Sequence, residues 1–219
     1  MIKALMRQPG HWMMIAIILL CVGIEAVLSL SDAGLIGSGR MRRIFYDYGG
    51  FWPGLLEDWR PNYTAQPWVM FLSYGFLHGG LMHLAVNMIT LWSLGVVVLD
   101  RVRGRGFVML YVASLLGGGV GYALLAPSLT PMVGASGALF GLAGGILAWS
   151  YVDRFTFRER LWPVARAFLL LLLLNVVLWW AMKGHLAWET HLGGFIAGWV
   201  AALLIDPRAV KDESTHSTL

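Results

Sequence analysis

Six long apolar runs constrain the fold of this chain more than any other feature of its sequence. A helix needs roughly 20 mostly apolar residues to cross a bilayer, and all the runs but the last approach that length. Only 13% of the residues are charged and 58% are hydrophobic, against about 25% and about 45–50% in soluble domains. We therefore expect an all-α membrane protein with six transmembrane helices in one bundle, formed by residues 12–30, 81–99, 107–125, 135–151, 165–182 and 191–205.

The basic residues predict how this bundle is oriented. Eleven of them precede the first run or follow the second, fourth and sixth, whereas five lie in the other connections. The positive-inside rule then places both ends of the chain, residues 1–11 and 207–219, in the cytoplasm. The membrane domain is expected to cover residues 12–206, with a long outer loop over residues 32–67. That loop is rich in Gly, Tyr and Trp, which favours an interfacial segment lying on the bilayer.

Other features of the composition exclude several classes of protein. Cys21 has no partner cysteine, so a disulfide framework is excluded. The formal net charge of +4 comes from basic residues between apolar runs, which indicates membrane orientation and no nucleic-acid partner. No internal repeat of the kind found in many transporters is evident. Glu25 lies inside the first run, where we expect it to be hydrogen-bonded within the bundle.

Four polar residues are predicted to meet at one depth near the outer face. Under the orientation above, His83 and Asn87 lie in the outer half of the second span, Ser136 begins the fourth, and His191 lies in the first turn of the sixth. Polar groups are costly inside a membrane, so each needs a partner or a purpose. We expect them to line a polar cavity that opens outward.

Ser136 and His191 are the candidates for covalent chemistry. Ser136 follows a loop and begins a helix, where its hydroxyl is accessible and nearby backbone N–H groups can bind an oxyanion. A serine hydroxyl becomes a good nucleophile when an imidazole takes its proton, which is the role expected of His191. The alternative is that both residues only make helix–helix hydrogen bonds.

Glycines near both residues are expected to allow close helix packing. Those of the fourth span recur every four residues, and those of the sixth would let it pack on the fourth. The two sets are Gly137, Gly141 and Gly145, then Gly193, Gly194 and Gly198.

Two histidines and an asparagine form a spaced motif, His78-x4-His83-x3-Asn87. His83 and Asn87 share one helix face, and His78 lies at the helix entrance. Three histidines could form a zinc site, but no acidic residue stands among them and His-Glu-x-x-His is absent. We therefore expect no metal and no other cofactor, and interpret Asn87 as an amide donor to an oxyanion.

Together these motifs resemble the rhomboid family of intramembrane serine proteases. The resemblance covers roughly residues 75–198, in the family's order and spacing. It includes Phe76-Leu77-His78-Gly79-Gly80-Leu81-Met82-His83 with Asn87, then Gly134-Ala135-Ser136-Gly137, then His191-Leu192-Gly193-Gly194.

The resemblance implies a Ser–His dyad without a catalytic carboxylate, a re-entrant outer loop, and substrates that are themselves membrane-spanning helices. Ser136 would be the nucleophile and His191 the general base. His83, Asn87 and the Ser136 backbone N–H would stabilise the oxyanion. Gly134 would shape the loop before the nucleophile. Gly137, directly after the nucleophile, would also help to shape the loop, and His78 would support the motif.

The chain departs from the family in its outer loop. Many rhomboids carry Trp-Arg eight or nine residues before the first His of the motif, where this chain has Val69-Met70, with Trp68 one place earlier. How the outer loop is anchored without that arginine is therefore open.

The expected function is that of an intramembrane serine endopeptidase that cleaves single-pass or polytopic membrane proteins near the outer face. A bacterial inner membrane is the simplest location for it. One alternative is a proteolytically silent rhomboid relative that binds membrane clients, and another is a small transporter with a polar outer cavity.

Overall fold

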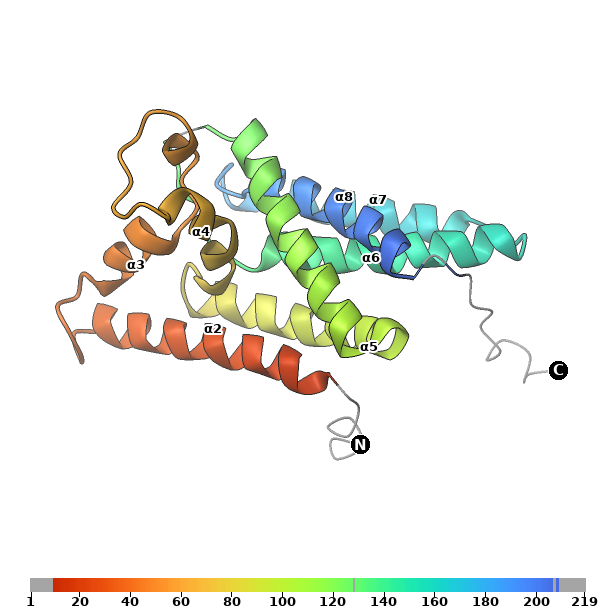
Figure 1. The fold of residues 1–219 in the computed structure, drawn as a ribbon, viewed down its shortest axis with the longest axis horizontal. Coiled ribbons are helices and arrows are strands. Elements are labelled where there is room, and N and C mark those ends of the chain that lie inside the picture. Colours follow the sequence, from red (N-terminus) through yellow and green to blue (C-terminus); the bar gives the residue numbers. More distant parts are fainter. Residues whose placement is uncertain (1–9, 128, 207, 209–219) are drawn as a thin grey trace.

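Helices form nearly all of the regular structure. The computed structural model describes residues 10–127, 129–206 and 208, so the predicted cytoplasmic ends lie almost entirely outside the described residues. Figure 1 shows the arrangement. In chain order the elements are α2 (His11–Asp32), α3 (Met41–Gly49), η1 (Pro53–Leu56), α4 (Gln66–Ser73), η2 (Tyr74–Phe76), α5 (Leu81–Leu125), α6 (Ser136–Thr156), α7 (Trp162–Ala181) and α8 (Trp188–Ile205).

The described helices confirm an all-α fold suited to a membrane. Four of them, α2, α5, α7 and α8, are long and apolar enough to cross a bilayer. The second and third predicted spans, residues 81–99 and 107–125, both lie in the 45-residue α5, which is kinked at Arg103 (φ 60°, ψ −173°). The fourth predicted span falls in the 21-residue α6, which is not among those four. The count of six spans therefore stays a prediction.

The kink of α5 is the point where several helix ends meet. Gly10, just before α2, lies so close to Gly104 that a Cβ atom on either would overlap the other backbone. The Arg101 guanidinium pairs with Asp153 near the end of α6 at 2.7 Å and with Asp206 after α8 at 3.2 Å. The starts of α6 and α8 consequently lie at the other end of the bundle, as Figure 1 shows.

Helices α6 and α8 pack backbone against backbone through glycine. A Cβ atom at Gly194 would overlap the Gly137 carbonyl oxygen, and one at Gly198 would overlap the Gly141 carbonyl oxygen. Side chains at these four positions would force the helices apart. This contact places the first turn of α8 beside the first turn of α6.

Gly193 differs from its expected role, because it faces α5 and not α6. A Cβ atom there would overlap the Gly117 carbonyl oxygen. Gly145 of α6 faces Leu110 of α5 and Ala202 of α8. Helix α8 is thus held between the second half of α5 and α6.

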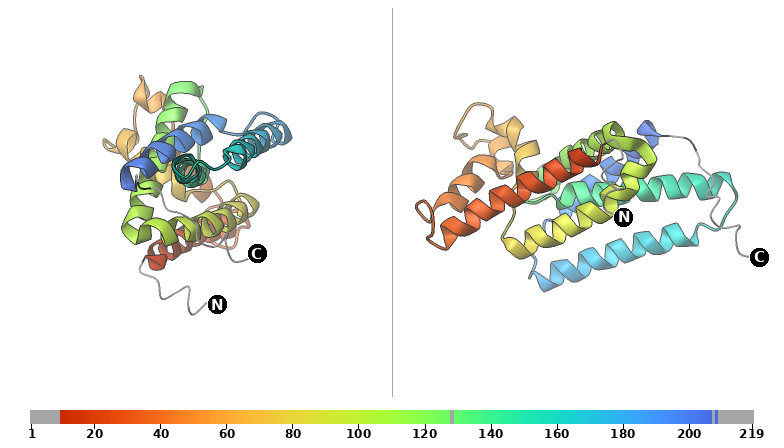
Figure 2. Two further views of the ribbon diagram at one scale, coloured as in Figure 1. Left: turned by 90° about the vertical axis from the view of Figure 1, so that its right-hand side faces the viewer. Right: turned by 90° about the horizontal axis from the view of Figure 1, so that it is seen from below.

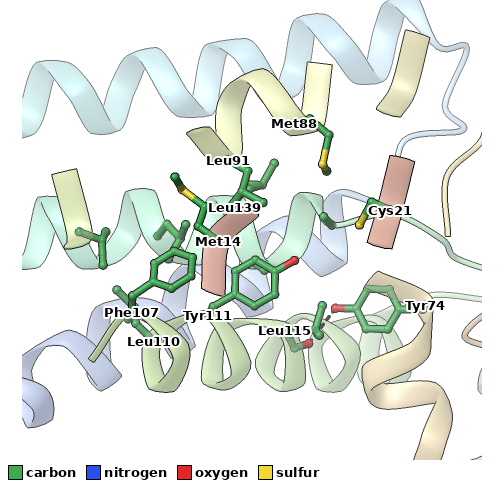
Figure 3. Packing of buried hydrophobic residues seen from close by; sticks show 14 of the residues in the cluster. Met14, Cys21, Tyr74, Met88, Leu91, Phe107, Leu110, Tyr111, Leu115 and Leu139 are labelled. Carbon is green, nitrogen blue, oxygen red and sulfur yellow. Dashed lines mark hydrogen bonds between the residues drawn. The ribbon is translucent and has the colours of Figure 1, made fainter. Parts of the chain in front are cut away.

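A hydrophobic core fills the space between α2, α5, α6 and the loop elements. Figure 3 shows Met14 of α2 beside Phe107 and Tyr111 of α5, all buried. At the far end of this cluster the Tyr74 hydroxyl donates to the Leu115 carbonyl oxygen at 2.7 Å. Tyr74 therefore joins η2 to the middle of the second half of α5.

An arginine within the outer loop anchors it to the first helix. The Arg42 guanidinium in α3 binds Glu25 of α2 at 2.8 and 3.0 Å, and Asp32 at 2.6 Å. The same guanidinium and the Tyr46 hydroxyl donate to the His78 carbonyl oxygen, at 2.9 and 2.7 Å. Glu25 is thus hydrogen-bonded within the protein, as expected, and Arg42 anchors the outer loop in a chain that has no arginine at position 69 or 70.

The outer loop is also tied to the segment that precedes α6. Phe51 and Met132 form an antiparallel β-bridge with two backbone hydrogen bonds of 2.9 Å. The Phe51 ring makes edge-to-face contacts with Phe71, Tyr74 and Tyr122. The position of the loop before Ser136 therefore depends on residues 32–67.

Helix α7 is the least buried of the long helices. Among its described residues only Val164 is buried, and both views of Figure 2 place it at the edge of the bundle. One contact with the bundle is the edge-to-face pair of Phe168 and Phe195, with centroids 5.8 Å apart.

Candidate active site

Ser136 and His191 lie together at the starts of two helices. Ser136 is the first residue of α6, and His191 is in the first turn of α8. The Ser136 Oγ is 2.9 Å from the His191 Nε2. His191 is 3% exposed and Ser136 is half-buried, so the hydroxyl is the more accessible partner.

Two further side chains hold the His191 ring. The Phe140 ring stacks on it with centroids 4.1 Å apart and planes 8° apart. On the other ring nitrogen, Nδ1 is 2.7 Å from the Asn175 Oδ1 of α7. The imidazole is therefore restrained on one face and at both nitrogens.

Asn175 and Phe140 were not predicted from the sequence. Asn175 is the one amide or charged residue between Arg166 and Lys183, and an amide in the middle of a spanning helix calls for a partner. This isolated amide in an apolar stretch is a signal from which Asn175 could have been predicted to have a partner. Phe140 lies four residues after Ser136, but nothing in an apolar helix distinguishes one aromatic residue from its neighbours.

His83 and Asn87 of α5 lie beside the loop that leads to Ser136. The Gly79 backbone N–H donates to the His83 Nδ1 at 3.1 Å, so the ring proton is on Nε2, which is a donor. The Asn87 side chain is buried, and its Nδ2 has no hydrogen-bond partner in the described part of the chain. Both groups thus retain N–H donors next to Gly134.

Gly134 is held where only glycine fits. Its φ is +129°, and a Cβ atom would lie 2.8 and 2.9 Å from two ring atoms of His83 and 3.6 Å from the Asn87 Nδ2. Its backbone N–H donates to the Tyr74 carbonyl oxygen at 3.0 Å. The structure therefore brings together His83, Asn87 and the loop before the nucleophile.

His78 lies behind this group and is fully buried. Its ring packs edge-to-face against His83, with centroids 5.3 Å apart, and its two nitrogens have no hydrogen-bond partner among the described residues. Burial, and to a smaller extent the His83 imidazole, lowers the pKa of His78 to about 4. Its carbonyl oxygen receives the Arg42 and Tyr46 hydrogen bonds described above.

No zinc ligand set is evident in this region. Among the described residues, no group of three or more His, Cys, Asp or Glu side chains gathers closely enough to hold a metal ion. That the chemistry needs no metal or other cofactor stays a prediction.

The arrangement provides the groups needed for acyl transfer. A hydroxyl faces an imidazole nitrogen, and donors from His83 and Asn87 lie near the loop that precedes it. The Ser136 backbone N–H is in the first turn of α6, where N–H groups have no intrahelical partner. A tetrahedral oxyanion needs donors of this kind.

Comparison with known proteins identifies the family. A family model described as Rhomboid domain matches residues 65–208, well over half of the chain. The chain belongs to the rhomboid family. Its all-helical fold and apolar spanning helices make it a multi-pass membrane protein.

The similar rhomboid proteins come from bacteria and eukaryotes. Rhomboid protease GluP of Bacillus subtilis (strain 168) is 32% identical over 136 residues, covering 62% of this chain and 25% of the relative. RHOMBOID-like protein 4 of Arabidopsis thaliana is 36% identical over 141 residues, covering 62% of this chain and 34% of the relative. Rhomboid protein 1, mitochondrial, of Saccharomyces cerevisiae is 29% identical over 150 residues, covering 59% of this chain and 40% of the relative.

The matches cover a minor part of these rhomboid relatives. The chain spans between a quarter and two fifths of the length of the three relatives above. One of them is a mitochondrial protein, so family membership alone does not assign this chain to a bacterial membrane.

Proposed function

We propose that this chain is an intramembrane serine endopeptidase that cleaves membrane-spanning substrates near the outer face of the bilayer. The observation that carries the proposal is the 2.9 Å separation of the Ser136 Oγ and the His191 Nε2. This distance is within hydrogen-bond reach, as required of a nucleophile and its general base.

The first half of the reaction forms an acyl-enzyme. The Ser136 oxygen attacks the substrate carbonyl carbon while the His191 Nε2 accepts the hydroxyl proton. The carbonyl oxygen becomes an oxyanion, stabilised by the His83 ring N–H, the Asn87 amide and the Ser136 backbone N–H. His191 then protonates the amine as the peptide C–N bond breaks.

The second half restores the enzyme. Water entering from the outer side attacks the acyl carbon as His191 accepts its proton. The ester bond to the Ser136 oxygen breaks, and His191 returns the proton to the serine. The products are a carboxylate and an amine, and no nucleotide or metal takes part in these steps.

The buried position of the dyad favours substrates with weak helices. A peptide bond inside a helix is protected by its own hydrogen bonds, and exposing backbone groups is costly in lipid. Gly, Pro or polar residues near the end of a substrate helix would therefore promote cleavage. We place the reaction in a bacterial inner membrane, with both ends of the chain in the cytoplasm.

The test is cleavage of a single-span reporter by the purified chain in liposomes. Ser136→Ala and His191→Ala should each abolish cleavage, while Ser93→Ala and His185→Ala, which change exposed residues, should cleave like the wild type. A wild-type rate in either dyad variant would disprove the assignment.

A fluorophosphonate probe separates the protease from a silent relative that binds membrane clients. Such probes react with activated serines, so the wild-type chain should be labelled and Ser136→Ala should not. Binding of reporter without cleavage or labelling would favour the silent relative. The transporter would be favoured by a different result. In that case the chain would show metal-dependent binding that is abolished by His83→Ala and unchanged by Ser136→Ala.

A further inference from the structure

We infer that Asn175 is a positioning residue that sets the orientation and protonation of His191. The inference rests on the proposed function for its catalytic meaning, although the contact itself can be tested separately. The Asn175 Oδ1 is 2.7 Å from the His191 Nδ1. The two residues come from different helices, α7 and α8.

The identity of the facing atoms determines where the imidazole proton lies. A carbonyl oxygen can only accept a hydrogen bond, so a proton on Nδ1 satisfies the Asn175 Oδ1. Neutral imidazole has one ring proton, and Nε2 is then left with a lone pair toward the Ser136 hydroxyl. This is the tautomer that a general base requires. The opposite tautomer would place a proton on Nε2, which could not accept another.

The same hydrogen bond helps the imidazole after it accepts the serine proton. Both ring nitrogens of the imidazolium are donors, and the Asn175 Oδ1 remains in place as an acceptor for Nδ1. The family's dyad has no carboxylate for this purpose. An uncharged amide supplies the acceptor without burying a second charge in the membrane.

The surroundings of Asn175 indicate that its side chain serves the hydrogen bond to His191 and not general helix packing. It lies in a helix that has no other amide or charged residue after Arg166 and that is mostly exposed at the edge of the bundle. In the described part of the chain, its contact with His191 is the one hydrogen bond between an α7 side chain and the rest of the bundle. The orientation of the base therefore depends on where α7 lies.

The first measurement is the tautomer of His191, which does not require activity. Histidine labelled with ¹⁵N in the full chain, solubilised in detergent, reports which ring nitrogen is protonated, and His191→Gln identifies the signals. The wild type should show a proton on Nδ1. Asn175→Leu should shift His191 toward the other tautomer, and Val176→Leu, a change at the next position, should not. Unchanged signals in Asn175→Leu would overturn the inference.

The second measurement is kinetic. Asn175→Leu should lower kcat for the reporter by about 10-fold to 100-fold, with KM and the melting temperature near wild type. This is at or below the lower end of the roughly 10²–10⁴-fold that a general base contributes, because the imidazole is still present but is less well oriented. Asn175→Asp keeps an acceptor oxygen and should recover most of kcat. Equal kcat in the wild type and Asn175→Leu, or loss through KM alone, would overturn a positioning role.

The two measurements also separate this inference from the proposed function. If the wild type fails to cleave the reporter while the tautomer shifts in Asn175→Leu, the protease assignment fails and the positioning contact stands. If the wild type cleaves the reporter and the His191 tautomer is the same in Asn175→Leu, the protease assignment stands and the positioning role of Asn175 fails. Should Asn175→Leu fold poorly, Asn175→Ala gives the same comparison.

Discussion

The Phe140 ring lies parallel to the His191 imidazole, with centroids 4.1 Å apart and planes 8° apart. Phe140 follows Ser136 by four residues, so both side chains project from the same face of α6. The helix that carries the nucleophile therefore also supports the base. Relative movement of α6 and α8 would disturb both the stacking and the hydrogen bond.

Replacing Phe140 with Ala should lower activity by freeing the imidazole. Aromatic pairs contribute about 0.5–1.5 kcal/mol beyond burial, so we expect roughly a tenfold fall in kcat from the lost orientation. Phe140→Tyr keeps the ring and should remain within about twofold of wild type on the same grounds. Reporter cleavage at saturating substrate measures both, and a wild-type kcat for Phe140→Ala would contradict the supporting role.

Gly134→Ala should damage the oxyanion site. The added Cβ would lie under 3 Å from the His83 ring, and displacing one oxyanion donor costs about 10²–10³ in kcat. The matched control is Gly34→Ala, which has a positive φ of +72° but no atom within 4 Å of the added Cβ. Both variants should be less stable by about 1–3 kcal/mol from backbone strain, and only Gly134→Ala should lose most of its activity. Comparable kcat in the two variants would contradict the steric argument.

Arg42→Met should destabilise the outer loop by leaving Glu25 buried without its cation. The Glu25 side chain is fully buried and that of Arg42 is 21% exposed, and breaking a buried ion pair costs about 3–5 kcal/mol. Glu25→Gln combined with Arg42→Met should recover much of that loss, because no buried charge remains. Equilibrium unfolding in mixed micelles measures each free energy.

The control for this prediction is Arg43→Met. Arg43 is 86% exposed and lies 3.7 Å from Asp47, and exposed pairs of this kind contribute about 0–1 kcal/mol. The two variants remove the same charge from adjacent residues of α3. Equal destabilisation by both would show that Arg42 is not an anchor.

His78 should make the protein less stable as the pH falls from about 6.5 to about 4. The folded-state pKa is lowered to about 4 from the ordinary 6.5, so in this window the unfolded state binds more protons and stability decreases with falling pH. The full effect is about 3 kcal/mol, and it is absent above the unfolded-state pKa. His78→Phe should remove it, while His185→Phe, at an exposed position, should not. Melting curves in detergent between pH 4 and pH 7 test this, and an unchanged slope in His78→Phe would refute it.

The sequence predicted the helices and the central pair of the site for identifiable reasons. Long apolar runs have few alternatives to spanning helices, and polar groups at helix starts are conspicuous inside a membrane. Ser136 and His191 could be predicted to lie at one end of the bundle from basic-residue counts. The non-helical residue Arg103, where α5 is kinked, falls within residues 100–106 that separate the second and third apolar runs.

The supporting contacts could not be predicted because they join segments far apart in the chain. The Arg42–His78 hydrogen bond spans 36 residues, and several arginines in the outer loop were equal candidates for it. Gly193 was assigned to the wrong helix neighbour because adjacent glycines face different sides of α8, and periodicity does not say which partner each side meets.

The Arg42 anchor bears on how members of this family are recognised. A sequence pattern that demands Trp-Arg ahead of His78 would pass over this chain, since Val69-Met70 stand there. Yet an arginine does reach the carbonyl oxygen of His78, from a helix much earlier in the chain. The outer loop is therefore tied to the segment before α5 without an arginine at position 69 or 70. A family model that scores residues 65–208 as a whole matches the chain despite this difference, so membership of the family does not depend on that dipeptide.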